Sequence, residues 1–142
     1  MGTFVANPVR PTRWMLWPLW FVGALALLAG CSEPPDLGPC SGSVELTATG
    51  GSSPTFNWTP CGVNLLTVYD AAGASMWTVH APDTLNTLFP PVTYGRRPAG
   101  AMEDSAAIPL RSGFGYTVRV FRVAHDLHGL TSVQAGETNF RY

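Results

Sequence analysis

The run YTVRVFRV, residues 116–123, decides the fold class of this chain. It is rich in β-branched and aromatic side chains, and apolar residues alternate with polar ones, which is the period of a strand with one buried face. On this alternation Tyr116, Val118 and Val120 point inward. Arg122 would point inward as well, at a position that favours a small apolar side chain, so we expect a β-bulge that turns Arg122 outward.

Shorter segments of the same character surround this run, and Gly- or Pro-containing turns separate them. No window combines helical periodicity with capping residues. We therefore predict an all-β chain: a single β-sandwich of seven to eight strands. The other expected strands are residues 44–48, 55–58, 65–69, 75–79, 92–94, 106–108 and 137–142.

Composition excludes two broad classes of protein. Hydrophobic residues make up 46% of the chain and charged residues 12%, which excludes a highly charged disordered protein. The eight basic residues are all Arg, and the net charge is −1. A protein that neutralises many phosphates needs a basic surface, so we expect no nucleic-acid partner.

The N-terminal segment has the pattern of an export signal. Arg10 and Arg13 precede an apolar run at 14–30, which ends in LAGC at 28–31. This ending resembles the lipobox of bacterial lipoprotein signal peptides. The resemblance implies cleavage between Gly30 and Cys31, and a diacylglycerol with palmitate-type chains on the Cys31 thiol. A plain transmembrane anchor is the alternative for an apolar run of this length.

The lipobox divides the chain into three parts: a signal peptide at 1–30, a lipidated Cys with a Pro-rich tether at 31–40, and a domain at 41–142. The expected location is the cell envelope, with the membrane as one partner through the lipid. In bacterial lipoproteins an Asp after the lipidated Cys retains the protein at the inner membrane. Ser32 stands there instead, which implies the outer membrane, on its periplasmic or surface face. In a cell with one membrane, the same signal implies the outer surface of the cell.

The domain resembles the fibronectin type III and immunoglobulin-like sandwiches. The residues that carry the resemblance are Trp58-Thr59-Pro60, Leu110 six residues before Tyr116, Gly113 between them, and Asp126 with Gly129 at a hairpin turn. The resemblance implies a tyrosine corner, in which the hydroxyl of Tyr116 bonds back to the main chain. It spans about 41–142. One departure is the segment 95–104, which is longer than a usual connection.

Cysteine usage agrees with export. Lipidation of Cys31 leaves Cys40 and Cys61 as an even pair in an oxidising compartment. A hairpin centred on Gly50-Gly51 would place the two opposite each other, so we predict a disulfide. A shared metal is the alternative, and two Cys without spaced partners support it weakly.

No motif for catalysis is present, so we expect no enzyme, no cofactor and no metal. The adjacent carboxylates Glu103 and Asp104 are expected to face solvent rather than to oppose each other across a cleft. His125, Asp126 and His128 could contribute to a zinc site, which leaves a metal-dependent hydrolase as a remote alternative. An ordinary turn is the simpler interpretation of these three residues.

A surface is the better functional candidate. Inward Leu66 and Val68 leave Leu65 and Tyr69 outward on one strand, and the run 116–123 leaves Arg119 and Phe121 outward on another. The resemblance implies that these two strands are neighbours, so the four side chains would share one exposed patch. Aromatic and Arg side chains dominate protein interfaces, so we expect an envelope protein as partner.

Two alternatives remain for this surface. Trp77 or the segment 95–104 could cover it as a second small core. The partner could instead be a glycan, stacked on Trp77, Tyr69 and Tyr94.

Overall fold

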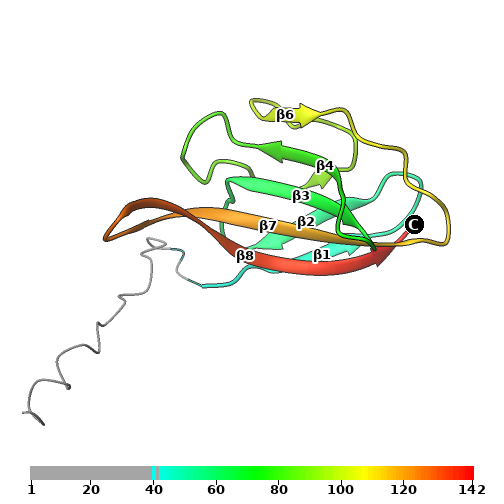
Figure 1. Cartoon of the computed structure of the whole chain (residues 1–142), viewed down its shortest axis with the longest axis horizontal. Coiled ribbons are helices and arrows are strands. Elements are labelled where there is room, and N and C mark those ends of the chain that lie inside the picture. Colours follow the sequence, from blue (N-terminus) through cyan, green and yellow to red (C-terminus); the bar gives the residue numbers. More distant parts are fainter. Residues whose placement is uncertain (1–39, 41) are drawn as a thin grey trace, which may run out of the picture. The chain divides into compact units, whose positions relative to one another are not determined.

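The computed structural model describes Cys40 and residues 42–142 of the chain. The predicted signal peptide, Cys31 and the tether up to Pro39 lie outside the described residues. The described part forms two antiparallel sheets and contains no α-helix, and therefore no helix that could span a membrane (Figure 1). This confirms the predicted all-β sandwich. The strands are β1 (Glu45–Thr49), β2 (Thr55–Thr59), β3 (Leu65–Asp70), β4 (Ser75–His80), β5 (Val92–Thr93), β6 (Met102–Ser105), β7 (Gly115–Asp126) and β8 (Gly129–Arg141).

The strands divide into a three-stranded sheet, in the order β1-β2-β5, and a five-stranded sheet, in the order β6-β4-β3-β7-β8. Strand alternation sends every second side chain into the space between the sheets. Trp77 is fully buried there, as is Phe56 from the facing sheet. Phe56 meets Phe140 edge to face, with ring centroids 5.4 Å apart. The remaining large buried side chains are Leu46, Trp58, Val63, Leu66, Val68, Val79, Leu88, Val92, Tyr116, Val118 and Val120.

The first hairpin forms as predicted but with a different centre. Glu45 pairs with Thr59, and Thr49 with Thr55, so the turn is centred on Ser52 and not on Gly50-Gly51. Cys40 and Cys61 are therefore not cross-strand neighbours. They lie outside the two strands, and the predicted disulfide nevertheless joins them, with Cα atoms 6.0 Å apart.

The segment between β5 and β7 folds differently from the prediction. Residues 106–108 form no strand, and β6 (Met102–Ser105) forms instead at the edge of the sheet, beside β4. The chain after β6 is held by individual hydrogen bonds and not by strand pairing. The Ile108 N–H donates to the Met76 carbonyl over 3.0 Å. The hydroxyl of Tyr94 donates to the Ile108 carbonyl over 2.7 Å. The long connection has thus become an extra edge strand.

The tyrosine corner implied by the resemblance is present. The hydroxyl of Tyr116 accepts a hydrogen bond of 2.8 Å from the backbone N–H of Arg111. Its ring is buried and stacks on Phe140 at 5.6 Å. This bond fixes the turn that leads into β7, and with it the register of the longest strand pair in the molecule.

Arg122 points inward, so the predicted outward turn is wrong. Its side chain is only 5% exposed, and its guanidinium donates to the carbonyl oxygens of Gly62 and Cys40. A bulge does exist, but the extra residue is Ala135 on β8, because Val120 pairs with Gly136 and Phe121 with Gln134. The bulge leaves the alternation of β7 intact.

Candidate functional site

The four residues of the predicted binding face lie on the outer face of the five-stranded sheet. The register of β3 and β7 places Leu65 directly opposite Phe121 and Arg119 opposite Thr67. Tyr69 lies two residues further along β3, on the same face. Each of the four side chains is half-buried, so each remains accessible from outside. We call Leu65, Tyr69, Arg119 and Phe121 the outer face.

Arg119 is held flat against the sheet at the centre of the outer face. Its guanidinium carbon lies 5.2 Å from the centroid of the Tyr69 ring, within the range of a cation–π contact. Its Nε donates to Glu137 Oε2 over 2.6 Å. Within the described residues its two terminal amino groups have no partner. The side chain is therefore positioned in advance, with donors left for a ligand.

Neither of the elements expected as a cover lies over the outer face. Trp77 is fully buried between the two sheets, on the other side of β4. The segment 95–104 leads into β6 at the sheet edge, and β4 and β3 separate β6 from β7. No other described strand packs on this face, as the edge-to-edge arrangement in Figure 1 shows.

The three rings considered for glycan stacking do not share a surface. Trp77 is inaccessible, and its Nε1 donates to Glu103. Tyr94 packs edge to face on Trp77 at 5.3 Å, while Tyr69 lies on the outer face beneath Arg119. The prediction of Trp77 as a stacking ring is therefore wrong.

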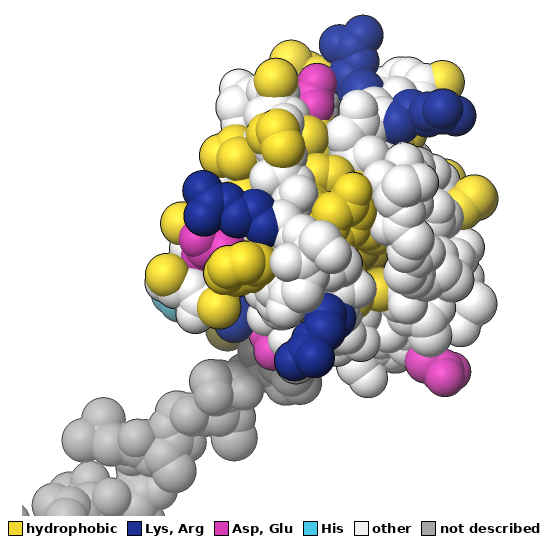
Figure 2. Space-filling model, turned by 90° about the vertical axis from the view of Figure 1, so that its right-hand side faces the viewer, with side chains coloured by type: hydrophobic (Ala, Val, Ile, Leu, Met, Phe, Trp, Pro, Cys, Tyr) yellow, Lys and Arg dark blue, Asp and Glu magenta, His cyan; other side chains and the backbone are white. Residues whose placement is uncertain are grey.

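A groove at the end of the sandwich that carries the C-terminus was not predicted. It encloses about 660 Å³, and Ile108 and Phe114 on its rim are 49% and 55% exposed. Figure 2 views this end, where hydrophobic side chains gather in a band with Arg side chains near its margins. Two large apolar residues in a turn-rich segment were the available signal, but Ile108 was assigned to a strand. Met76, Leu110, Arg111 and Tyr116 complete the main lining.

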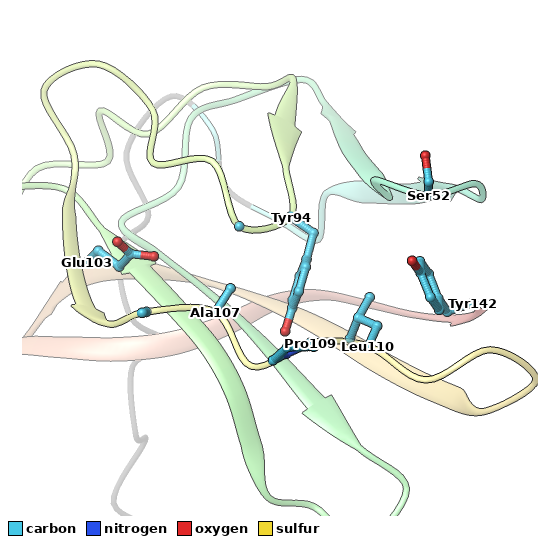
Figure 3. Close-up of a pocket in the computed structure, with 9 residues that line it drawn as sticks. Ser52, Tyr94, Glu103, Ala107, Pro109, Leu110 and Tyr142 are labelled. Atoms are coloured by element: carbon cyan, nitrogen blue, oxygen red, sulfur yellow. The ribbon is translucent and has the colours of Figure 1, made fainter.

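A second hollow, of about 450 Å³, adjoins this groove and shares Pro109 and Leu110 with it. Figure 3 shows Tyr94 standing across it, with its hydroxyl directed at Pro109 and with Glu103 to one side. Burial, with a smaller contribution from the nearby Tyr116, raises the pKa of Tyr94 to about 12. The Tyr94 hydroxyl and the Glu103 carboxylate are both engaged in internal hydrogen bonds. The hollow is therefore lined by polar groups that already have partners within the domain.

The residues considered for catalysis are dispersed. Glu103 bonds to Trp77, whereas Asp104 lies 3.2 Å from Nε2 of His80. The two carboxylates thus diverge into separate contacts. Asp104 is exposed, as predicted, whereas Glu103 is partly buried against Trp77, so the expectation that it faces solvent is wrong.

At the β7–β8 turn, Asp126 Oδ1 accepts the His128 N–H over 2.7 Å, and Gly129 has a positive φ of 119°. This is the ordinary turn predicted for these residues. His125 lies beside the turn on β7, opposite Leu130. Within the described part of the chain, no three His, Cys, Asp or Glu side chains are grouped to hold a metal ion.

Comparison with known proteins found no matching family model, no matching curated protein and no matching solved structure.

Proposed function

We propose that this chain is a cell-envelope lipoprotein, anchored through a lipid on Cys31, whose β-sandwich is a non-catalytic docking module for another envelope protein. The outer face is the proposed contact surface. The observation that carries the proposal is the positioned Arg119, held between Tyr69 and Glu137 on a sheet face that no described element covers. Aromatic and Arg side chains in fixed positions are the typical anchors of protein interfaces, because little conformational entropy is lost when they bind.

The arrangement of side chains on the outer face also supports this function. Leu65 and Phe121 form an apolar pair at one end of the outer face, and Arg119 with Tyr69 forms a polar-aromatic pair at the other. An apolar contact beside unsatisfied guanidinium donors suits a partner with an apolar side chain next to a carboxylate or carbonyl group.

Docking is tested by crosslinking in intact cells followed by affinity purification. The test variant combines Tyr69→Ala, Arg119→Ala and Phe121→Ala. We expect a protein that is recovered with wild type and lost with the variant. The matched control changes exposed residues of the opposite sheet, Glu45 and Thr47, to Ala. Equal recovery with wild type and with the test variant would reject the outer face as the contact surface.

The anchor is tested separately by metabolic labelling with palmitate. We expect wild type to carry the label in the membrane fraction and Cys31→Ser to lose it. Label that persists in Cys31→Ser would place the lipid elsewhere. A wild-type chain without label would favour the plain transmembrane anchor.

A further inference from the structure

The β7–β8 hairpin extends beyond the body of the sandwich. The pairing of β7 with β3 ends at Phe121, whereas its pairing with β8 continues to Asp126 and Gly129. The last five residues of β7 therefore have no strand neighbour except β8. Arg122 and Ala124 among them are still buried against the domain, so the projecting part is the tip from His125 to Leu130. Figure 1 shows this hairpin projecting at the end of the molecule opposite to the C-terminus.

The tip of this hairpin exposes two leucines among polar residues. Leu127 occupies the turn with 77% of its surface exposed, and Leu130 follows at 52%. The Asp126 and Gly129 turn fixes the tip. In water this turn favours polar residues, so the leucine at its apex gains significance only together with other exposed hydrophobic residues nearby.

Two further exposed hydrophobic residues lie at the same end. Leu85 is 58% exposed and Phe89 is 61% exposed. Their loop is tied to the hairpin by Asn86, whose side chain accepts from the Val123 N–H at 2.8 Å and donates to its carbonyl at 3.0 Å. Thus four of the seven large hydrophobic residues that are exposed in the described chain gather around the base and tip of the hairpin.

The chain also enters the domain at this end. Arg122, at the base of the hairpin, bonds to the carbonyl oxygen of Cys40, where the described domain begins. Eight residues separate Cys31 from Cys40, which limits their separation to about 30 Å by covalent geometry. A lipid on Cys31 would therefore hold the bilayer within reach of the hairpin tip.

We propose that Leu127 and Leu130 insert into the surface of the bilayer that holds the lipid anchor, with Leu85 and Phe89 beside them. This inference depends on the lipid anchor of the proposed function. The proposed contact is made by the apolar side chains. Arg122 is buried, and the polar side chains at the tip are His125, Asp126 and His128, so no exposed Arg is available there to bind anionic headgroups. Insertion should therefore not require anionic lipid. The hairpin would fix the domain upright, with the C-terminal groove directed away from the membrane.

The test uses the acylated protein in phosphatidylcholine vesicles, with an environment-sensitive fluorophore on Leu127→Cys. Because Cys40 and Cys61 are bonded and Cys31 is acylated, the introduced thiol is the free one. Phe114→Cys at the opposite end, where Phe114 is 55% exposed against 52% for Leu130 at the tip, is the control. With nitroxide-bearing lipids, we expect quenching at position 127 to exceed that at 114 at least threefold, with or without added phosphatidylglycerol. Equal quenching at the two positions would overturn the inference.

A second variant separates insertion driven by the protein from insertion driven by the fluorophore. With the probe at Leu130→Cys, the added change Leu127→Asp should reduce lipid quenching at least twofold. Unchanged quenching would overturn the inference, as would a spectral shift that follows protein concentration instead of lipid, which would indicate a second copy. The mass of the protein reports acylation: an acylated chain with an unquenched tip rejects this inference alone, whereas a chain without acyl groups rejects the anchor as well.

Discussion

Arg122 donates its Nε hydrogen to the carbonyl oxygen of Gly62 over 3.1 Å, although the two residues are 60 positions apart. The same guanidinium reaches the carbonyl of Cys40. One buried side chain therefore joins β7 to Cys40 of the disulfide and to Gly62, which follows Cys61. Burial lowers the pKa of Arg122 below its ordinary value, and no carboxylate among the described residues forms an ion pair with it. Backbone carbonyls take the place of a counter-ion.

Replacement of this guanidinium should destabilise the fold. Arg122→Met keeps the apolar stem but leaves two carbonyl oxygens without donors, which costs about 1–3 kcal/mol. Equilibrium unfolding in urea measures this loss. Arg119→Met, which removes a partly exposed ion pair, should cost less than about 1 kcal/mol. An Arg122→Met protein as stable as wild type would mean that desolvation of the cation offsets its hydrogen bonds.

Gly136 is required by the close approach of the chain that precedes β1. A Cβ atom there would lie 2.9 Å from Val44 Cγ2 and 3.0 Å from the Val44 carbonyl oxygen. Gly136→Ala should therefore cost about 1–3 kcal/mol, because backbone has to move. Gly115→Ala on β7 is the control, since its Cβ would meet nothing within 4 Å. A melting temperature that falls equally in both variants would contradict this explanation.

The alternation of side chains was sufficient to predict the fold class and the residues that point outward on each strand. Alternation with a period of two gives the outward position of Leu65 on β3 and of Phe121 on β7. That the two strands are neighbours came from the resemblance to fibronectin type III sandwiches, and the register of β3 and β7 pairs the two residues. The same alternation placed Arg122 inward correctly. The prediction that a bulge turns this cation outward was wrong. The sequence does not show that the carbonyl oxygens of Gly62 and Cys40 lie where the inward guanidinium can bind them.

The remaining errors concern segments without a buried face. β6 reads MEDS and lies at an edge with most side chains exposed, so no apolar period marks it. The first half of β8 pairs only within the projecting hairpin, which explains why only residues 137–142 were recognised. The groove was not predicted because long-range hydrogen bonds position the segments that line it. The Tyr94 hydroxyl binds the Ile108 carbonyl, and the Tyr116 hydroxyl binds the Arg111 N–H near Phe114. Such contacts have no local sequence signal.

The disulfide should stabilise the domain by restricting its unfolded chain. It joins residues 21 positions apart, for which the chain-entropy model gives about 3 kcal/mol. The double variant Cys40→Ser and Cys61→Ser should lose about this amount in a urea titration. Reduced wild type should match the double variant, because both lack the same constraint. A loss below about 1 kcal/mol would indicate that the β1–β2 pairing already restricts the unfolded chain.

Tyr94 should make stability depend on pH in the alkaline range. Its pKa rises from the ordinary 10.0 to about 12, chiefly because the hydroxyl is buried. Below pH 10 the folded and the unfolded chain both keep the proton of the Tyr94 hydroxyl. Between the two values the unfolded chain loses it while the folded chain keeps it, so the free energy of unfolding falls as pH rises.

Urea unfolding of wild type and Tyr94→Phe from pH 8 to pH 12 measures this dependence. At pH 8 the variant should be less stable by about 1 kcal/mol, because the bond to the Ile108 carbonyl is lost. Above pH 10 its decline should be shallower than that of wild type, so the two curves converge. Any contribution from Arg122, whose pKa is lowered by burial, is common to both proteins and cancels in the comparison. Parallel curves over the whole range would mean that Tyr94 ionises equally in the folded and unfolded states.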